Sequence, residues 1–351
     1  MMTRNSLGLR GSSMWPDKTI IVAELSCNHR GSYDEAVALV EAAAKAGADA
    51  VKIQLYSPET MTLPMDTEPF QIHSGPWAGR TLWDLYSEAR TPWSWAQPLQ
   101  EVARVLGLEF IVSIYDPTAL MFTEYMLDVW AYKIASFEIT DLNLIRAVAR
   151  TGKRVIISTG MATEDEILAS LHPFTLLTGL DHVAVLHCVT AYPTPLHYMN
   201  LHMVHRQYQD RLHHVVRGLS DHSLSPMVPA LAVAAGARII EKHFTRSRAN
   251  GAADATFSLE PDEFKEMVER VRETEVIMYG RVEAVDEAFY RRYRRSVHCV
   301  KDMTVGEVFT PENVRTLRGP AGMTDLAVVL GRTASRIIER GQVIQRGDID
   351  D

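Results

Sequence analysis

The chain has 351 residues, of which 46% are hydrophobic, so it can bury a full core and exceeds one common domain size. Its formal net charge of -8 excludes a general basic field that would attract nucleic acid or an anionic membrane. Three cysteines, an odd number spread along the chain, argue against a disulfide framework and favour a reducing, cytoplasmic location.

The first 18 residues lack an apolar core of signal-peptide length, and we expect them to be a disordered leader. No apolar stretch approaches the roughly 20 residues of a membrane span. From residue 19 onward, short apolar runs alternate with segments whose apolar residues have helical spacing. The chain therefore starts its folded part near residue 19.

Eight apolar runs before residue 280 predict β-strands. They are Ile20–Leu25, Ala50–Gln54, Glu109–Ile114, Ala131–Ala135, Arg154–Ser158, His182–His187, His214–Leu219 and Arg238–Glu241. The predicted helices are Tyr33–Ala46, Trp95–Leu106, Thr118–Leu127, Asn143–Thr151, Thr163–Ser170, Pro229–Ala235 and Pro261–Tyr279. Eight strands alternating with helices over residues 19–280 predict a (β/α)8 TIM barrel rather than an open doubly wound sheet.

Two segments depart from this alternation. Residues 56–92 are rich in proline and glycine and too long for an ordinary connection, which indicates a lid or a substrate wall. Residues 281–296 contain a basic run and are expected to be a linker. Short β-like pieces at Val297–Val300, Val314–Leu317 and Val343–Ile344 predict a small β-rich domain over 297–351. So few residues form a marginal domain, which we expect to pack on its own barrel or on a partner.

A histidine closes each of two neighbouring predicted strands, His222 after Ser220-Asp221 and His243 after Glu241-Lys242. The carboxyl ends of parallel strands share one face of a barrel, where active sites form. Two imidazoles there predict a site for a divalent metal that polarises a substrate carbonyl. The alternative is that either ring only hydrogen-bonds at the rim, and Asp221 either supports a ligand or caps a turn.

Lys52 and Lys133 lie within predicted strands, where an unpaired ammonium is costly, so we expect them to meet an anion. A Schiff-base lysine of an aldolase is the alternative. Hydroxyl groups recur where predicted strands end and would suit a phosphate and a carboxylate on one small ligand. These hydroxyl residues are Ser113, Ser136, Ser158, Thr190 and Ser220.

Glu24 and Glu138 are candidate proton-transfer or hydroxyl-binding groups at the same mouth, unless they only form salt bridges with the strand lysines. Asp254 follows the last predicted strand. His29 and His187 are expected to make hydrogen bonds rather than to bind metal.

Several segments together resemble the N-acetylneuraminate (sialic acid) synthase family. They are Ile21–Glu24, Ala46–Gln54, Tyr132–Glu138, Ser158–Met161, Tyr192–Pro195, Ser220–His222, Glu241–Phe244 and Phe257–Pro261. The tail, with Gly331-Arg332 and Arg340-Gly341, resembles the antifreeze-like (SAF) domain of that family. Each segment alone is weak evidence for the family, but the whole set is specific to it and covers the chain from about residue 19.

The resemblance implies condensation of phosphoenolpyruvate with an open-chain amino-sugar aldehyde, giving a nonulosonic acid and phosphate. It implies Mn2+ or Mg2+ on His222 and His243, and a phosphoenolpyruvate site made by Lys52, Ser113, Lys133, Ser136, Ser158, Thr190 and Ser220. The implied sugar and proton-transfer residues are Glu24, Gln54, Glu138, Tyr192 and Asp254. It also implies a domain-swapped homodimer in which Arg318 of one SAF domain reaches the sugar in the partner's barrel.

Within the family, Trp77–Tyr86 and Thr91–Trp93 most resemble pseudaminic acid synthases, for which the sugar is 2,4-diacetamido-2,4,6-trideoxy-altrose. Departures from the sialic acid synthase pattern are Thr190 in place of Asn, Ser113–Asp116, and Asn250–Asp254 without Gly-Pro-Asp. These departures bear on the identity of the sugar more than on the type of reaction. The alternative enzyme is an N-acetylneuraminate or legionaminate synthase, and the alternative of another class is a non-catalytic sugar-binding protein.

Overall fold

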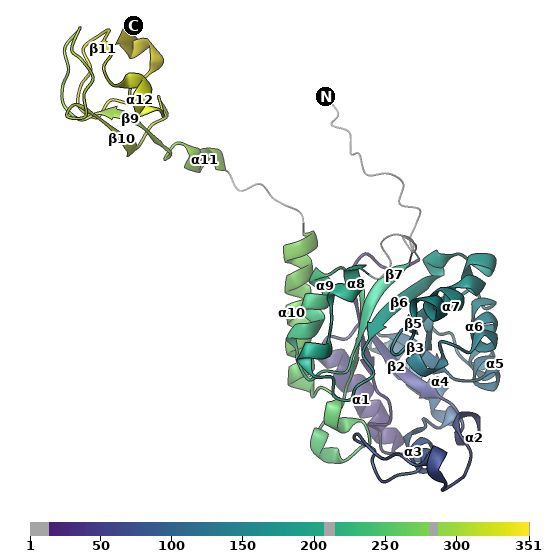
Figure 1. Ribbon diagram of the computed structural model, residues 1–351. Coiled ribbons are helices and arrows are strands. Elements are labelled where there is room, and N and C mark those ends of the chain that lie inside the picture. Colours follow the sequence, from purple (N-terminus) through teal and green to yellow (C-terminus); the bar gives the residue numbers. More distant parts are fainter. Residues whose placement is uncertain (1–13, 207–214, 281–286, 351) are drawn as a thin grey trace. The chain divides into compact units, whose positions relative to one another are not determined.

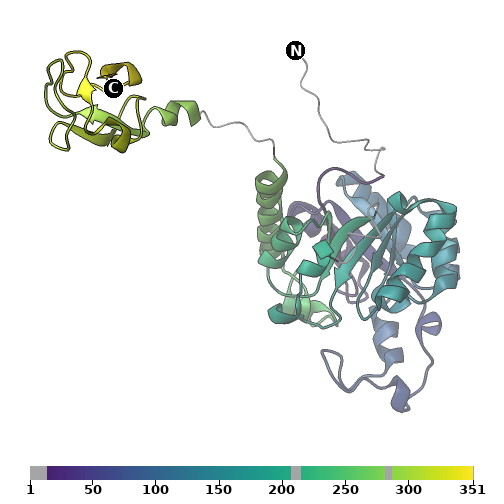
Figure 2. The same cartoon turned by 45° about the horizontal axis from the view of Figure 1, so that its top comes forward.

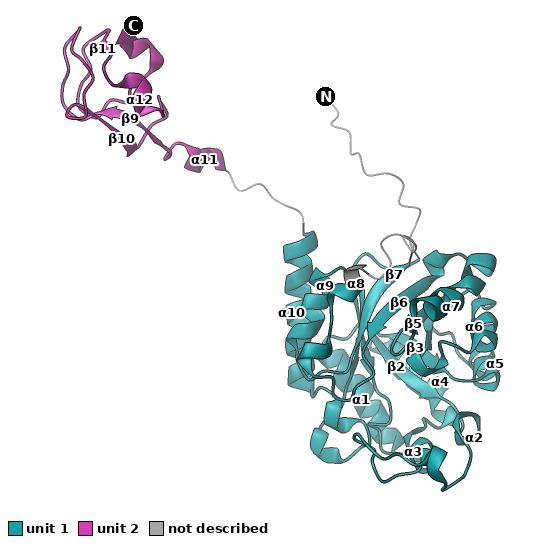
Figure 3. Ribbon diagram, in the orientation of Figure 1, with its two compact units in different colours: residues 1–280 teal, residues 281–351 magenta. Residues whose placement is uncertain are grey.

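The computed structural model describes residues 14–206, 215–280 and 287–350. The chain divides into two compact units, Met1–Gly280 and Arg281–Asp351 (Figure 3). Residues 1–13 of the expected leader, His214 of the seventh predicted strand and residues 281–286 of the expected linker lie outside the described part.

The first unit is a closed barrel of eight strands in sequence order, with every neighbouring pair parallel (Figure 1). The strands are β1 Ile20–Glu24, β2 Ala50–Leu55, β3 Glu109–Ile114, β4 Ala131–Ile134, β5 Arg154–Ser158, β6 Val183–Cys188, β7 Val216–Asp221 and β8 Ile239–His243. The predicted TIM barrel is confirmed. Its strands are buried on both faces, which is why they read as continuous apolar runs.

Helices surround the barrel in both views (Figure 2). They are α1 Tyr33–Lys45, α4 Ala96–Val105, α5 Pro117–Met126, α6 Leu142–Ala149, α7 Glu164–Leu177, α8 His202–Arg206, α9 Met227–Ala234 and α10 Pro261–Tyr279. Their starts follow local chemistry: the Asp116 and Asp141 carboxylates cap α5 and α6, and Thr163 with Glu166 forms a capping box on α7. α7 continues past Pro173, beyond its predicted end.

A lower layer of apolar side chains fills the barrel interior, among them Val22, Ile111, Ile156 and Ile239. Trp15 packs beneath this layer, is 6% exposed, and meets Trp130 edge-on with ring centroids 5.4 Å apart. The expectation of a disordered leader as far as residue 18 is therefore wrong for Trp15. Its indole covers apolar surface at the amino-terminal end of the barrel. The local sequence pattern does not predict this burial.

The long segment between β2 and β3 is not irregular throughout. It contains α2 Pro58–Met61, the 3-10 turns Glu68–Phe70 and Trp93–Trp95, and α3 Leu82–Ala89, which Thr81 caps. The helix α3 was missed because it is short and follows a glycine- and proline-rich stretch. The segment with α2 and α3 projects from one end of the barrel (Figures 1 and 2).

The second unit contains α11 Glu287–Arg291, α12 Leu326–Val329 and the strands β9 Arg295–Cys299, β10 Val314–Arg318, β11 Thr333–Ala334 and β12 Ile349–Asp350. β9 pairs antiparallel with β10, and β11 with β12, around a small core that includes Phe309 and Ile338. The segment expected to be a linker thus carries α11 and the start of β9. The strand expected at Val343–Ile344 is reduced to one bridge, between Val343 and His298.

Candidate active site

A cavity of about 410 Å³ opens at the carboxyl ends of the barrel strands. Polar side chains from the strand ends line one part of it, and apolar side chains of the segment between β2 and β3 line another. Eleven of the predicted site residues line the cavity: Lys52, Gln54, Lys133, Ser136, Glu138, Ser158, Tyr192, Ser220, His222, His243 and Asp254. The closed barrel is what gathers residues so distant in sequence.

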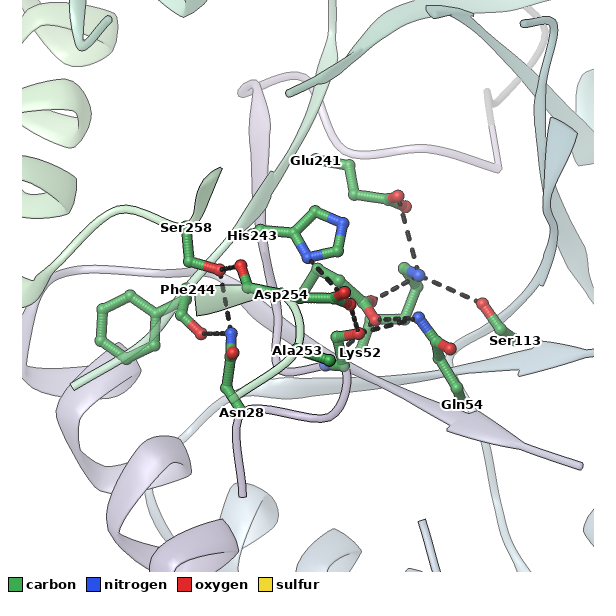
Figure 4. A network of polar contacts seen from close by, with 12 residues as sticks. Asn28, Lys52, Gln54, Ser113, Glu241, His243, Phe244, Ala253, Asp254 and Ser258 are labelled. Carbon is green, nitrogen blue, oxygen red and sulfur yellow. Dashed lines mark hydrogen bonds and ion pairs between the residues drawn. The ribbon is translucent and has the colours of Figure 1, made fainter. Parts of the chain in front are cut away.

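Lys52 lies at the centre of a buried charge network (Figure 4). Its ammonium forms an ion pair with Glu24, donates to Ser113 Oγ at 3.1 Å and lies 3.6 Å from Glu241 Oε1. Lys133 Nζ approaches the same Glu241 oxygen at 3.8 Å. The expected salt bridge between Glu24 and a strand lysine is thus present, and a second carboxylate stands between the two lysines.

The two lysines differ electrostatically. Burial alone would lower the pKa of Lys52, but the carboxylates of Glu24 and Glu241 outweigh burial and raise it. Burial lowers the pKa of Lys133, and the opposing charge of Glu241 does not make up for it, because Lys52 lowers the pKa further. Burial would raise the pKa of Glu241, but Lys133 and Lys52 lower it. Lys133 is therefore the cation that an incoming anion would stabilise most.

The imidazoles of His222 and His243 face one another with ring centroids 5.6 Å apart. His222 Nδ1 donates to the carbonyl of Val189 at 3.1 Å. Burial would lower the pKa of His222, but the adjacent Cys188 thiol and this hydrogen bond outweigh burial and raise it. His243 Nδ1 is buried without a hydrogen-bond partner, and Asp254 Oδ2 is 3.9 Å away. Burial, then the nearby His222 and Lys52, hold the pKa of His243 well below its usual range, so its ring is neutral.

Aromatic rings surround the histidine pair. Tyr192 packs on His222 with ring centroids 4.2 Å apart, and Phe257 packs on His243 at 4.9 Å. The two histidines predicted to make hydrogen bonds both do so: His187 bonds the carbonyl of Met199 at 2.9 Å, and His29 Nδ1 accepts from the Gly31 amide at 3.0 Å while its ring packs edge-on against Trp95. Neither lines the cavity.

Two hydroxyl groups, those of Ser136 and Thr190, lie close to Gly160. The Gly160 amide donates to Ser136 Oγ at 3.0 Å, and a Cβ at Gly160 would lie 2.3 Å from Thr190 Oγ1 and 2.9 Å from Ser136 Oγ. Any larger residue at this position would have to displace these two hydroxyls. The hydroxyls of Thr190 and Ser158 are buried without hydrogen-bond partners. A bound anion would accept hydrogen bonds from both of these hydroxyls.

Glu138 follows β4 at the edge of the cavity. Its Oε2 is buried without a hydrogen-bond partner, and burial raises its pKa to about 7 against the opposing charge of Lys133. A carboxyl that titrates near neutral pH can both donate and accept a proton. Glu138 therefore has acid–base properties that suit proton transfer at neutral pH.

The segment between β2 and β3 gives the cavity an apolar wall, which is formed by Met61, Ile72, Trp77, Leu82, Leu85 and Ala89. Trp77 joins this wall to the loop after β8, because its indole nitrogen donates to the carbonyl of Ala253 at 3.0 Å. Its ring centroid also lies 5.4 Å from that of Tyr192. The expectation of a substrate wall rested on composition, and the residues of this segment do line the cavity.

Four predicted site residues do not line the cavity. Glu24 forms an ion pair with Lys52, Ser113 accepts a hydrogen bond from Lys52, and the Thr190 hydroxyl lies close to Gly160. Arg318 is exposed at the end of β10 in the second unit, and the role that the resemblance implies for it stays a prediction.

Glu241 and Cys188 are among the lining residues for which no role was predicted from the sequence. Glu241 lies two residues before His243 in β8, so the alternation of a strand would have placed both side chains inside the barrel. Cys188 ends β6 opposite Ser220. Burial would raise the pKa of its thiol, but the adjacent His222 outweighs burial and lowers it. All three cysteines are free.

The model of the NeuB family matches residues 39–283, and the model of the SAF domain matches residues 294–350. The chain belongs to the NeuB family. It is 40% identical to the pseudaminic acid synthase of Campylobacter jejuni over 337 residues, which are 94% of this chain and 96% of that protein. It is 35% identical to the pseudaminic acid synthase of Helicobacter pylori, over 94% of this chain and 97% of that protein.

Among solved structures, the sialic acid synthetase of Leptospira borgpetersenii in complex with citrate matches with a TM-score of 0.69 and 28% identity. The match covers 79% of this chain and 92% of that one. No helix in the described part of the chain is long and apolar enough to cross a membrane.

Proposed function

We propose that this NeuB-family chain is a pseudaminic acid synthase, which condenses phosphoenolpyruvate with 2,4-diacetamido-2,4,6-trideoxy-altrose to give a nonulosonic acid and phosphate. The observation that carries the proposal is the gathering of two buried lysines, the unsatisfied hydroxyl of Ser158 and two adjacent imidazoles in one cavity. The identity of 40% over nearly the whole chain to a pseudaminic acid synthase supports it.

Phosphoenolpyruvate carries a phosphate and a carboxylate, and the polar part of the cavity suits both. Lys133 and the hydroxyls of Ser136, Ser158 and Thr190 would hold one anionic end, and Lys52 and Ser220 the other. The unsatisfied hydroxyls supply donors at no cost to existing hydrogen bonds. Fixing phosphoenolpyruvate beside the acceptor sugar lowers the entropic part of the barrier, a contribution of about 7 to 11 kcal/mol at best.

The residues present fit a divalent cation. An ion lies about 2.1 Å from an imidazole nitrogen, so two rings that share one have centroids about 4.5 to 6 Å apart. The observed separation of 5.6 Å and the unpartnered Nδ1 of His243 meet this requirement. No cluster of three or more His, Cys, Asp or Glu residues suited to a metal occurs in the described part of the chain.

His222 and His243 would therefore hold Mn2+ or Mg2+, with remaining positions left to water and substrate. The bound cation would supply Lewis acidity that withdraws charge from the aldehyde carbon of the sugar. The depressed pKa of His243 keeps its ring neutral, which a metal ligand requires.

The reaction follows from these positions. The enol carbon of phosphoenolpyruvate attacks the aldehyde carbon, a carbon–carbon bond forms, and Glu138 donates a proton to the new alkoxide oxygen. The positive charge left on the second carbon of phosphoenolpyruvate is taken up by water, which loses a proton. Cleavage of the bond from that carbon to the phosphate oxygen then yields the keto group and phosphate.

The apolar wall favours the 6-deoxy, diacetamido sugar. An acceptor that carries a C6 methyl and two acetamido methyls can bury them against Ile72, Leu82 and Trp77, whereas a hydroxymethyl group would leave a hydroxyl unpaired there. The residue Thr190, in place of the usual Asn of sialic acid synthases, agrees with a different sugar. An N-acetylneuraminate or legionaminate synthase remains the alternative.

Phosphate release tests the proposal. The purified chain should release phosphate from phosphoenolpyruvate with Mn2+ only when the altro sugar is present, and faster than with manno- or bacillosamine-derived sugars. Preference for a manno sugar would support the alternative synthase. Borohydride trapping of a lysine adduct would support a Schiff-base aldolase, and tight sugar binding without turnover a sugar-binding protein.

We also propose a domain-swapped homodimer in the cytoplasm, in which Arg318 of one subunit completes the sugar site of its partner. The family resemblance of residues 294–350 to a SAF domain supports this arrangement. Mixing an Arg318→Ala subunit with a His222→Ala subunit tests it. Activity should return to about a quarter of wild type only if the two residues act across subunits.

A further inference from the structure

A fully buried ion pair stands directly beside the two histidines. Lys242 Nζ lies 2.6 Å from Asp221 Oδ2, and both side chains are 0% exposed. Asp221 immediately precedes His222 and Lys242 immediately precedes His243. The two charged residues are also direct partners in the pairing of β7 with β8. The ion pair therefore joins the two strands one residue before each imidazole.

The same pair also holds the turn that follows His222. Asp221 Oδ1 accepts a hydrogen bond from the Ser223 amide at 2.8 Å, and Lys242 Nζ donates to the Ser223 carbonyl. The backbone of His222 is thus held on both sides, since its own carbonyl accepts from the Thr194 amide at 3.0 Å. The position of His222 relative to β8 depends on these contacts.

Stability alone does not explain such a pair. Taking two charges out of water is costly, and apolar residues of similar volume often replace a buried ion pair without loss of stability. The pair lies outside the cavity lining, so it does not meet substrate either. What it does supply is a directional connection between β7, β8 and the Ser223 turn, which apolar side chains lack.

We propose that the Asp221–Lys242 ion pair is a positioning device that sets the separation of His222 and His243 for a shared divalent cation. This rests on the metal site of the proposed function. Neither residue would bind the ion itself: consecutive residues of a strand point to opposite faces, so Lys242 points away from the side that carries His243. Groups that orient metal ligands in this way typically change metal affinity by about 10- to 100-fold.

The test compares Mn2+ binding by two double variants, with free Mn2+ measured by electron paramagnetic resonance. Asp221→Val/Lys242→Met removes the buried pair. Glu269→Val/Lys265→Met makes the same replacements in an exposed ion pair of α10 and is the matched control. We expect the first variant to bind Mn2+ about 10- to 100-fold more weakly than wild type and the control to match wild type. Affinity within twofold of wild type in a folded first variant overturns the proposal.

A second measurement needs no metal. Hydrogen exchange of the peptide that spans residues 221–223 should be at least about tenfold faster in the Asp221→Val/Lys242→Met protein, because the Ser223 amide loses its acceptor. Unchanged exchange overturns the positioning role even if Mn2+ binding changes. Wild-type protein that binds no Mn2+ contradicts the metal site of the proposed function instead, and the exchange result then decides the positioning role alone.

If the double variant does not fold, Asp221→Asn takes its place. It keeps an oxygen that can accept from the Ser223 amide and removes the charge that pairs with Lys242. We expect it to weaken Mn2+ binding by about tenfold, and a change of less than twofold overturns the proposal.

Discussion

Substitution of Glu138 by Gln should make the protein more stable at alkaline pH while it removes activity. Burial raises the pKa of this carboxyl to about 7, against an ordinary value of 4.5. Below about pH 4.5 the group is protonated in both the folded and unfolded chain, and the substitution changes little. As pH rises to 7, the unfolded chain releases the proton first, so wild-type protein loses stability.

The magnitude follows from the same pKa. A difference of about 2.5 pKa units, at about 1.4 kcal/mol each, makes the ionised Glu138 cost up to about 3 kcal/mol above pH 7. Glu138→Gln carries no charge at any pH and avoids this cost. The variant should therefore exceed wild type in free energy of unfolding by up to about 3 kcal/mol at pH 8 and by little at pH 4.

The assay is urea unfolding at pH 4 and pH 8, combined with phosphate release. Glu41→Gln, at an exposed position of α1, is the control and should leave the pH dependence of stability unchanged. Activity of Glu138→Gln should fall by about 10²- to 10⁴-fold if Glu138 transfers a proton. A variant that is less stable than wild type at pH 8, or equally active, refutes the reasoning.

Three further variants test other parts of the account. Leu82→Gln places an amide in the apolar wall and should raise the KM for the 6-deoxy sugar by about tenfold or more without changing the KM for phosphoenolpyruvate, whereas Leu63→Gln, exposed in the same segment, should change neither. Lys133→Met should raise the KM for phosphoenolpyruvate by about 10- to 100-fold, and an unchanged value would remove this lysine from the anion site. Trp15→Ala should lower the free energy of unfolding by about 3 to 5 kcal/mol with kcat unaltered; a loss under 1 kcal/mol would show that its burial is unimportant.

The barrel could be predicted because its determinants are local. Each strand is a short apolar run closed by a turn, and glycine or a capping residue bounds the helices, so no long-range information was needed to count eight units. The proximity of His222 and His243 could be predicted for a similar reason. Residues at equivalent ends of parallel strands meet at one mouth, whatever the detailed packing.

The features that the sequence did not predict depend on the folded barrel rather than on local sequence patterns. Trp15 packs against Trp130, and the two residues are far apart in sequence, so its burial depends on the finished barrel. Glu241 pairs with Lys52 and Lys133, which lie on other strands. These pairings form only when the barrel closes, so they could not be predicted from the residues around Glu241. Helix α3 is short, and its apolar residues follow the cavity wall rather than a long helical period.

The most direct test of the central claim is the location of the cation. A crystal soaked in Mn2+ should show one strong anomalous diffraction peak about 2.1 to 2.3 Å from a nitrogen of both His222 and His243, on the side that faces Lys52 and Lys133. A Mn2+-dependent, active enzyme whose peak lies elsewhere, or contacts only one of the two imidazoles, would contradict the account.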